Sequence, residues 1–180
     1  GKPLAYTLLP AAARLLANGA TLEGSGADVN VGMMPGDDFR YLRTWWECSL
    51  TGTTEWRDYE KGNGFARFLS DPAVRVRATN DFAEASADIA SKYGSASRFI
   101  MNRARYGQAG LVYTRITVKG FSVRYLLPRQ VFSGAGLAIF PKDAASVASL
   151  CAYLNTRVVE HSLASLTDGR KWEAGYVRSA

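Results

Sequence analysis

The segment from Arg98 to Gln108 (RFIMNRARYGQ) concentrates side chains that can bind a nucleic acid. The guanidinium of arginine pairs through two N–H groups with a phosphate or with the O6 and N7 atoms of guanine. The amides of Asn and Gln pair in a similar way with adenine. The segment therefore indicates non-covalent recognition of a nucleic acid, carried by Arg98, Asn102, Arg103, Arg105 and Gln108.

This segment lies within a longer stretch that holds only positive charges. The chain has 180 residues, with 22 Lys and Arg against 16 Asp and Glu and a formal net charge of +6. Between Ile89 and Lys142 there is no Asp or Glu, and aromatic side chains lie among the cations. This pattern favours a polyanionic partner. A solvated basic sheet face that binds nothing stays open as the alternative. A membrane surface is disfavoured because the stretch does not have the pattern of an amphipathic helix.

A second candidate contact is the loop Lys61-Gly62-Asn63-Gly64, which places backbone N–H groups beside a cation. Such an arrangement binds phosphate. The alternative is a tight turn that closes onto Phe65 and Phe68. The full set of predicted DNA-binding residues is Lys61, Asn63, Arg67, Arg98, Asn102, Arg103, Arg105, Gln108, Arg115, Lys119 and Arg124.

Residues suited to catalysis or metal binding are few. The single histidine, His161, follows a helical pattern with Val158 and Leu163, which is typical of a partly buried helix residue rather than of a ligand or base. The sequence has no CxxC or HExxH motif and no phosphate-binding GxxxxGK[ST] loop. Asp37 and Asp38 fit helix capping better than a metal site. We therefore predict no catalytic residue and no metal site.

Residues 132–136 (FSGAG) match FxGxG, which marks the S-adenosylmethionine loop of adenine methyltransferases. That loop needs a strand before it and a helix after it. Here residues 137–140 (LAIF) have the pattern of a strand, and the partner [DNS]PP[YFW] tetrapeptide is absent. We therefore expect no cofactor in this chain.

The composition, 47% hydrophobic, excludes a disordered chain. No apolar run approaches the roughly 20 residues of a membrane-spanning helix, and we expect no signal peptide and no membrane partner. Cys48 and Cys151 are expected to be core residues in a reducing setting, the prokaryotic cytoplasm.

The hydrophobic pattern predicts one α+β domain over residues 1–180, with a mixed, mostly antiparallel, twisted β-sheet flanked by helices. Strands rich in β-branched and aromatic residues are predicted within 110–118, 120–127 and 136–140, and a half-exposed strand at 75–77. Residues 172–177 are predicted to be extended.

Helices are predicted at 10–18, from Asp37 through Leu42 with Trp45 as the alternative limit, at 80–92 with Asn80 or Asp81 as cap, from Asp143, and at 156–166. In the last of these, Val158, Leu163 and Leu166 are expected to face inward. Trp45 and Trp46 are expected to be core residues that lead into a strand.

Several segments resemble a known family. Residues 32–47 (GMMPGDDFRYLRTWWE) resemble the segment GlxTGDNxxFlrxWxE of large restriction-modification adenine-N6 methyltransferases. These include the methyltransferases of BREX and DISARM phage-defence systems and fused type II restriction enzymes. Residues 56–68 (WRDYEKGNGFARF) resemble WxxYxKGGxFRrWy, and residues 150–159 (LCAYLNTRVV) resemble LlgllNSkvv. The matches keep the family's order over residues 3–178, although Met34-Pro35 and Asn63-Gly64 depart from its pattern.

The resemblance implies a target recognition domain, which reads the DNA sequence for a methyltransferase catalytic domain. It implies that double-stranded DNA and that catalytic domain are partners, with other defence-system subunits as further candidates. S-adenosylmethionine and the NPPY-type motif would belong to the catalytic domain upstream. The chain would then be a fragment that is no enzyme on its own.

Two other hypotheses remain open from the sequence. One is a protein-interaction module whose basic face meets an acidic partner, and the other is a divergent self-contained enzyme. DNA binding that falls steeply with salt would favour the recognition domain. Salt-insensitive partner capture would favour the module, and saturable S-adenosylmethionine binding would favour the enzyme.

Overall fold

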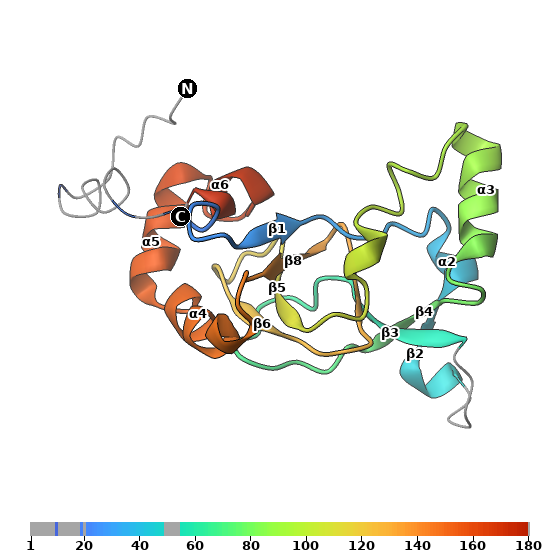
Figure 1. Ribbon diagram of the computed structural model, residues 1–180, viewed down its shortest axis with the longest axis horizontal. Helices are drawn as coiled ribbons and strands as arrows, with labels where there is room; N and C mark the ends of the chain where they lie inside the picture. Colours follow the sequence, from blue (N-terminus) through green and yellow to red (C-terminus); the bar gives the residue numbers. More distant parts are fainter. Residues whose placement is uncertain (1–9, 11–18, 20, 49–54, 180) are drawn as a thin grey trace.

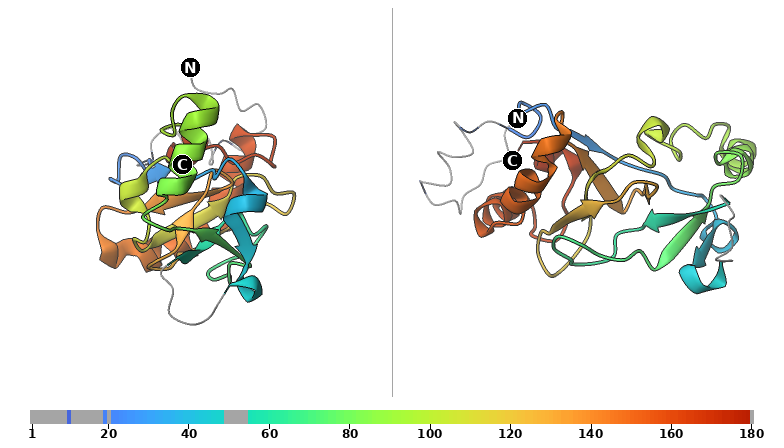
Figure 2. Two further views of the ribbon diagram at one scale, coloured as in Figure 1. Left: turned by 90° about the vertical axis from the view of Figure 1, so that its right-hand side faces the viewer. Right: turned by 60° about the horizontal axis from the view of Figure 1, so that its bottom comes forward.

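Two four-stranded β-sheets lie next to each other along the long axis of the molecule, with helices at both ends (Figures 1 and 2). The computed structural model describes residues 10, 19, 21–48 and 55–179. The predicted α+β class and the mostly antiparallel pairing are confirmed, with two sheets in place of the single predicted one. Apart from Pro10, the helix predicted at 10–18 lies outside the described residues.

The first sheet contains the strands predicted in the basic stretch. Its order is β1 (Asp28–Asn30), β8 (Gly136–Phe140), β5 (Gly110–Thr114) and β6 (Val123–Leu126), and all its pairs are antiparallel. Every residue of β5 and β8 is buried. The middle of this sheet is therefore covered on both faces.

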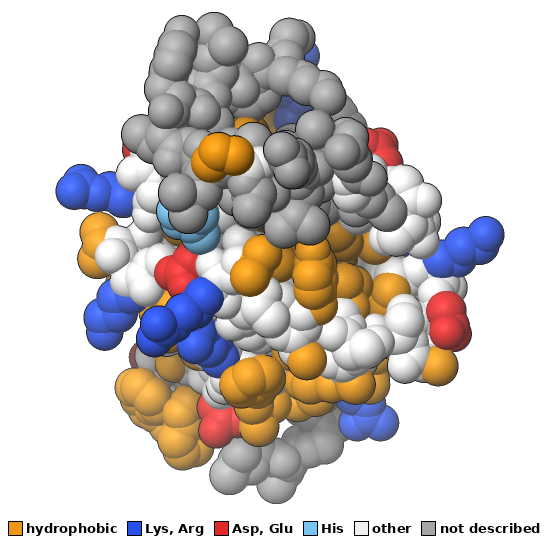
Figure 3. Space-filling view, turned by 90° about the vertical axis from the view of Figure 1, so that its left-hand side faces the viewer, with side chains coloured by type: hydrophobic (Ala, Val, Ile, Leu, Met, Phe, Trp, Pro, Cys, Tyr) orange, Lys and Arg blue, Asp and Glu red, His pale blue; other side chains and the backbone are white. Residues whose placement is uncertain are grey.

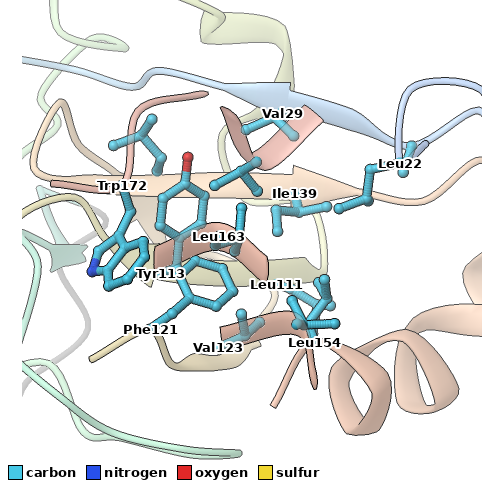
Figure 4. Packing of buried hydrophobic residues seen from close by; sticks show 14 of the residues in the cluster. Leu22, Val29, Leu111, Tyr113, Phe121, Val123, Ile139, Leu154, Leu163 and Trp172 are labelled. Atoms are coloured by element: carbon cyan, nitrogen blue, oxygen red, sulfur yellow. The ribbon is translucent and has the colours of Figure 1, made fainter. Parts of the chain in front are cut away.

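The helices α4 (Val147–Leu154), α5 (Arg157–Leu166) and α6 (Ala174–Arg178) cover one face of the first sheet (Figure 4). Asp143 caps the 3₁₀ turn Ala144–Ser146 that leads into α4, as the sequence predicts. Thr156, predicted as the first residue of the next helix, is the cap of α5. Val158 is 56% exposed, so the prediction that it faces inward is wrong. Val159 and Leu163 fill the core in its place. The extended segment predicted at 172–177 is also wrong, because α6 occupies most of it.

The second sheet has the order β2 (Leu42–Thr44), β4 (Val74–Arg77), β3 (Trp56–Glu60) and β7 (Val131–Phe132). The helix α2 (Asp38–Tyr41) is a single turn capped by Asp37. It ends one residue before the predicted limit because Leu42 pairs with Val76 in β2. The helix α3 (Ala83–Tyr93) packs on this sheet through Ala85.

Two local predictions beside the second sheet are wrong. Trp45 and Trp46 lie in the 3₁₀ turn Trp45–Glu47 and are 47% and 63% exposed, so they are not core residues. Neither Asn80 nor Asp81 caps α3, because both adopt left-handed backbone conformations ahead of Phe82, which occupies the cap position without a side-chain hydrogen bond.

The two sheets are joined through β7, which belongs to the second sheet and leads through a short turn into β8 of the first. A shared apolar cluster lies at this junction, formed by Val112, Leu126, Phe132, Ala138 and Phe140. A buried ion pair, Arg124 to Glu60, also connects β6 with β3. The sheets therefore share one continuous interior.

Both described cysteines are buried and free, as predicted. Burial raises the pKa of the Cys48 thiol and that of the Cys151 thiol. Within the described part of the chain, no helix combines the length and the apolar character needed to cross a membrane.

Asn155 connects the end of α4 to strand β6 and gives the first stability prediction. Its Oδ1 accepts a hydrogen bond from Val123 N (3.0 Å), and its Nδ2 donates to Val123 O (2.8 Å). The change Asn155→Ala leaves the buried Val123 N without a partner, whereas Val123 O keeps a hydrogen bond from Phe68 N (3.0 Å). We therefore expect a loss of about 1–3 kcal/mol in the free energy of unfolding. Urea denaturation measures the loss. The control is Ser149→Ala, which changes an exposed residue of α4. An equal loss for the two changes would contradict the structural role of the Asn155 hydrogen bonds.

Candidate nucleic-acid interface

The hairpin of β5 and β6 divides the predicted DNA-binding residues into separate groups. The pairing of Gly110 with Leu126 and of Tyr113 with Val123 fixes the two ends of this hairpin. Gln108 precedes β5 at one end, whereas Arg115 and Lys119 lie in the connection at the other. A five-residue strand spans roughly 17 Å. The predicted residues therefore do not form one compact patch.

The first basic surface consists of residues around the 3₁₀ turn Arg103–Arg105 and the turn between β6 and β7. Gly107 N donates to Gln130 O (2.9 Å), and Arg129 N donates to Gly107 O (3.2 Å), which places Arg129 beside the turn. Arg129 was missed among the candidates, although it lies in the acid-free stretch. The surface comprises Arg98, Asn102, Arg103, Arg105, Gln108 and Arg129, and all of them except the half-buried Arg105 are exposed.

Two arginines of the first basic surface are held by exposed carboxylates. Arg103 is paired with Asp81 at 2.7 Å and Arg105 with Asp28 at 2.6 Å. Arg105 also lies over the ring of Phe140, with the guanidinium carbon 5.2 Å from its centroid. Exposed ion pairs contribute little stability, about 0–1 kcal/mol. The ion pairs therefore hold the guanidinium groups of Arg103 and Arg105 in place, but they are weak enough for a DNA phosphate to replace the carboxylate.

The other members of the first basic surface differ in whether their side chains already have a partner in the fold. All the Asp and Glu residues lie in the described part of the chain, and none of them pairs with Arg98 or Arg129 there. Asn102 Nδ2 donates to Val31 O (2.9 Å), so the fold already uses its amide. Gln108 accepts from Arg105 Nη1 (3.3 Å) and donates to Ala104 O (2.9 Å). Within residues 21–48 and 55–179, the guanidinium groups of Arg98 and Arg129 have neither a hydrogen-bond partner nor a carboxylate partner.

A stacked aromatic pair lies next to Arg98 and was not predicted. The rings of Tyr93 and Phe99 are 4.7 Å apart at an interplanar angle of 24°. Met34 N donates to Phe99 O (2.7 Å), which fixes the segment that carries Phe99. Tyr93 is exposed. The sequence feature that could have identified Tyr93 is its position beside Lys92 in the acid-free stretch. An exposed aromatic face flanked by cations is suited to stacking on a base.

The loop at Lys61 is packed onto the first sheet. Lys61 pairs with Asp38. A Cβ at Gly62 would lie 2.7 Å from Ala135 O, and Thr114 Oγ1 donates to Gly64 O (2.6 Å). Asn63 Nδ2 is buried and has no hydrogen-bond partner in the described part of the chain. The loop therefore has a packing role, and a phosphate contact there stays a prediction.

A second group of cations forms what we call the ribbon surface, at the far end of the β5–β6 hairpin. Thr117 N donates to Arg170 O (2.9 Å) and Trp172 N donates to Arg115 O (2.7 Å). With the bridge between Ile116 and Lys171, residues 115–117 and 170–172 form a short two-stranded ribbon. The basic members of the ribbon surface are Arg67, Arg115, Lys119, Arg170 and Lys171.

Ion pairs hold part of the ribbon surface. Arg115 and Lys171 both contact Glu173, at 2.8 and 3.0 Å, and the hydrogen bond from Arg115 is the main reason why the pKa of Glu173 lies below its usual range. Arg67 lies 3.6 Å from Glu160. Lys119 and Arg170 have no carboxylate partner in the described chain. Arg170 and Lys171 were missed because the residues that they adjoin are about fifty positions away in the sequence.

Arg124 is fully buried, so the prediction that it contacts DNA is wrong. Its Nη2 lies 2.7 Å from Glu60 Oε2, and its Nη1 donates to Thr114 Oγ1 (3.3 Å). Burial raises the pKa of Glu60, while Arg124 opposes this rise. Arg124 is thus a structural residue between the two sheets.

The motif at residues 132–136 has a geometry unlike that of an S-adenosylmethionine loop. Gly134 lies between β7 and β8, and Gly136 is the first residue of β8, so the motif leads into a strand and not into a helix. A Cβ at Gly136 would lie 2.9 Å from Gly62 N, which shows that the protein's own backbone fills this space. The residues at this motif therefore do not fit the cofactor. Within the described ranges, no group of three or more His, Cys, Asp and Glu could hold a metal ion. His161 lies on α5 as expected, but it is exposed, so the prediction that it is partly buried is wrong.

No protein-family model matches the chain. The chain is similar to the adenine-specific methyltransferase BrxX of Escherichia coli O9:H4 (strain HS), with 25% identity over 147 residues. The aligned region covers 77% of this chain and 12% of BrxX, so the chain spans a small part of its relative's length. This similarity relates the chain to adenine-specific methyltransferases.

Proposed function

We propose that the chain recognises double-stranded DNA for an adenine-N6 methyltransferase of a restriction-modification or phage-defence system. The observation that carries the proposal is the first basic surface, where backbone hydrogen bonds through Gly107 hold Arg129 beside the turn at Arg103–Arg105 and its base-reading side chains. The similarity to an adenine-specific methyltransferase supports the same role. Catalysis and S-adenosylmethionine binding would be supplied by another part of the methyltransferase.

The contacts of the first basic surface suggest how it would divide the task. Arg98 and Arg129, which are free of carboxylates, would bind phosphates and set the affinity. Arg105 is held in a fixed orientation by Gln108 and by the Phe140 ring. A fixed guanidinium is suited to a bidentate contact with a guanine edge. Tyr93 would offer its ring to a base beside these contacts.

A protein-interaction module is the second candidate, and one observation favours it. Phe39, which lies in α2, and the adjacent pair Trp45 and Trp46, which follows β2, are exposed. Trp and Phe are enriched in protein–protein interfaces. This aromatic surface lies on the second sheet and is compatible with DNA binding through the first basic surface, so the two roles can coexist.

The test of the proposed function is binding of a fluorescein-labelled random duplex, followed by anisotropy from low to physiological salt. We expect log K to fall with log salt at a slope of about −3 to −6, as for the release of a few counterions. In the double variant Arg98→Ala/Arg129→Ala the slope should become shallower by about 2, with about tenfold weaker binding at physiological salt.

Two control variants separate charge from geometry. Arg98→Lys/Arg129→Lys keeps both charges and should retain the salt slope. Arg157→Ala removes an exposed cation on α5, and its binding should equal that of the wild type. Absence of binding at low salt would overturn the proposal, and salt-insensitive capture of a protein partner would then support the interaction module.

A further inference from the structure

The ribbon surface exposes apolar side chains among its cations. Ile116 is 64% exposed and Val118 is 80% exposed. Both are branched at Cβ, and they flank Thr117, whose backbone N–H is bonded to Arg170 O. The two side chains are therefore presented by a backbone that hydrogen bonds hold in place. The ribbon adjoins α5 at the end of the molecule seen in Figure 3, where hydrophobic, basic and acidic side chains lie close together.

The charge of the ribbon surface favours a polyanion. Its five cations face three carboxylates, those of Glu160, Glu173 and Asp168. Asp168 is engaged by the backbone N–H groups of Arg170 and Lys171 (both 3.0 Å). The side chains of Lys119 and Arg170 have no carboxylate partner among the described residues, so both can bind an anionic partner. An acidic partner would then have to cover Ile116 and Val118 as well.

The minor groove of DNA meets both requirements. It is about 6 Å wide, with a row of phosphates on each side and a floor of base edges and sugars. Proteins that bind there frequently insert apolar side chains between base steps while Lys and Arg contact the flanking backbone. In the ribbon, Arg170 lies opposite Thr117, which separates Ile116 from Val118, and Lys119 follows Val118, so both cations adjoin the two apolar residues.

The separation of the two basic surfaces agrees with one duplex that contacts both. They lie at opposite ends of the β5–β6 hairpin, roughly 17 Å apart along the strands. One turn of B-form DNA is about 34–36 Å long, so the major and minor grooves alternate on one side of a duplex about every 17 Å. A duplex that presents its major groove to the first basic surface would present its minor groove to the ribbon.

We propose that the ribbon inserts Ile116 and Val118 into the minor groove of the bound duplex, with Lys119 and Arg170 on the flanking phosphates. This inference rests on the proposed DNA-recognition function and adds a second, apolar contact to it. The ribbon thereby fixes the orientation of the duplex on the first basic surface.

The test compares two double variants of the full chain by anisotropy with an A·T-rich duplex. Lys119→Ala/Arg170→Ala should make the salt slope shallower by about 2. Ile116→Ser/Val118→Ser should weaken binding about tenfold with an unchanged slope, since it removes a non-ionic contact. A polyamide that fills the minor groove should weaken the wild type but leave the Ile116→Ser/Val118→Ser variant nearly unaffected. Lys142→Ala, which removes an exposed lysine packed against Gly26, is the control and should bind like the wild type.

The outcomes separate this inference from the proposed function. If Arg98→Ala/Arg129→Ala weakens binding while both ribbon variants bind like the wild type, the ribbon inference is overturned and the DNA-recognition function stands. Unchanged wild-type affinity in the presence of the polyamide also overturns the insertion. A wild type that does not bind DNA at low salt overturns both. Thermal melting of each variant verifies that the exposed substitutions leave the fold intact.

Discussion

The change Arg124→Met is expected to lower the free energy of unfolding by about 3–5 kcal/mol, because it leaves the Glu60 carboxylate buried without its partner. Both side chains of the pair are fully buried, and Glu60 Oε1 already has no hydrogen-bond partner in the described structure. The loss of Arg124 would therefore leave a charge in the interior between the two sheets. Urea denaturation at pH 7 measures the effect.

The loss caused by Arg124→Met should also depend on pH. Burial raises the pKa of Glu60, and Arg124 is the main group that opposes this rise. Without Arg124, the pKa of Glu60 in the folded state rises further above its value in the unfolded chain. A carboxyl group with a raised folded-state pKa favours folding at low pH, and this contribution is lost as the pH increases through that pKa. We therefore expect the variant to be more destabilised at pH 8 than at pH 5.

Two further variants control this prediction. The double change Glu60→Met/Arg124→Met removes both charges and should recover most of the lost stability, since apolar pairs of similar volume often replace a buried ion pair without cost. Arg75→Met breaks the more exposed pair with Asp58 (3.0 Å) and should cost about 0–1 kcal/mol. A loss for Arg124→Met as small as that for Arg75→Met would show that Glu60 is not left charged in the interior.

Arg124 also shows why the sequence misplaced one member of the candidate site. In the sequence it is one cation among nine in an acid-free stretch, which favours an exposed position. Its burial depends on Glu60, which lies 64 positions away on a strand of the other sheet. A pattern of alternating residues reveals the two faces of a strand, but not which faces another sheet will cover.

Features that depend on near neighbours were predicted well. Asp37 and Asp143 both accept the backbone hydrogen bond expected of a helix cap, since the cap and its partner are two or three residues apart. The strands of the first sheet likewise follow from their β-branched and aromatic composition. In contrast, the exposure of Trp46 and the left-handed backbone at Phe82 depend on how the chain turns between elements, which residue type alone did not indicate.

The same distinction applies to the candidate interface. The segment from Arg98 to Gln108 was found because its residues are close together in the sequence. The ribbon was not, because its two halves, residues 115–117 and 170–172, meet only in the folded chain. Arg170 and Lys171 are therefore recognised as members of the ribbon surface only from the pairing of Ile116 with Lys171 in the structure.

Close backbone contacts explain two glycines in motifs that had suggested chemistry or family membership. Gly32 opens the segment that resembles the methyltransferases, and Gly136 ends the FxGxG match. Gly32 N donates to Ser133 O (3.1 Å) and Met33 N to Phe132 O (3.0 Å), so this segment pairs with β7 along the edge opposite β3. A Cβ at Gly32 would overlap the Phe132 carbonyl, and a Cβ at Gly136 would overlap the Glu60 carbonyl. Both glycines allow backbones to meet where the two sheets join.

The change Gly32→Ala is accordingly expected to cost about 3 kcal/mol in the free energy of unfolding, the upper part of the range for overpacking. The added methyl group meets backbone atoms of Phe132, which β3 holds on the other side through the pairing of Glu60 with Phe132, so little relaxation is available. The matched control is Gly175→Ala in α6, where no atom lies within 4 Å of the new Cβ. That change should stabilise the protein by about 0.5–1 kcal/mol, because alanine has the higher helix propensity. Urea denaturation measures the free energy of unfolding of both variants. A denaturation midpoint for Gly32→Ala equal to that of the wild type would contradict the close backbone contact at β7.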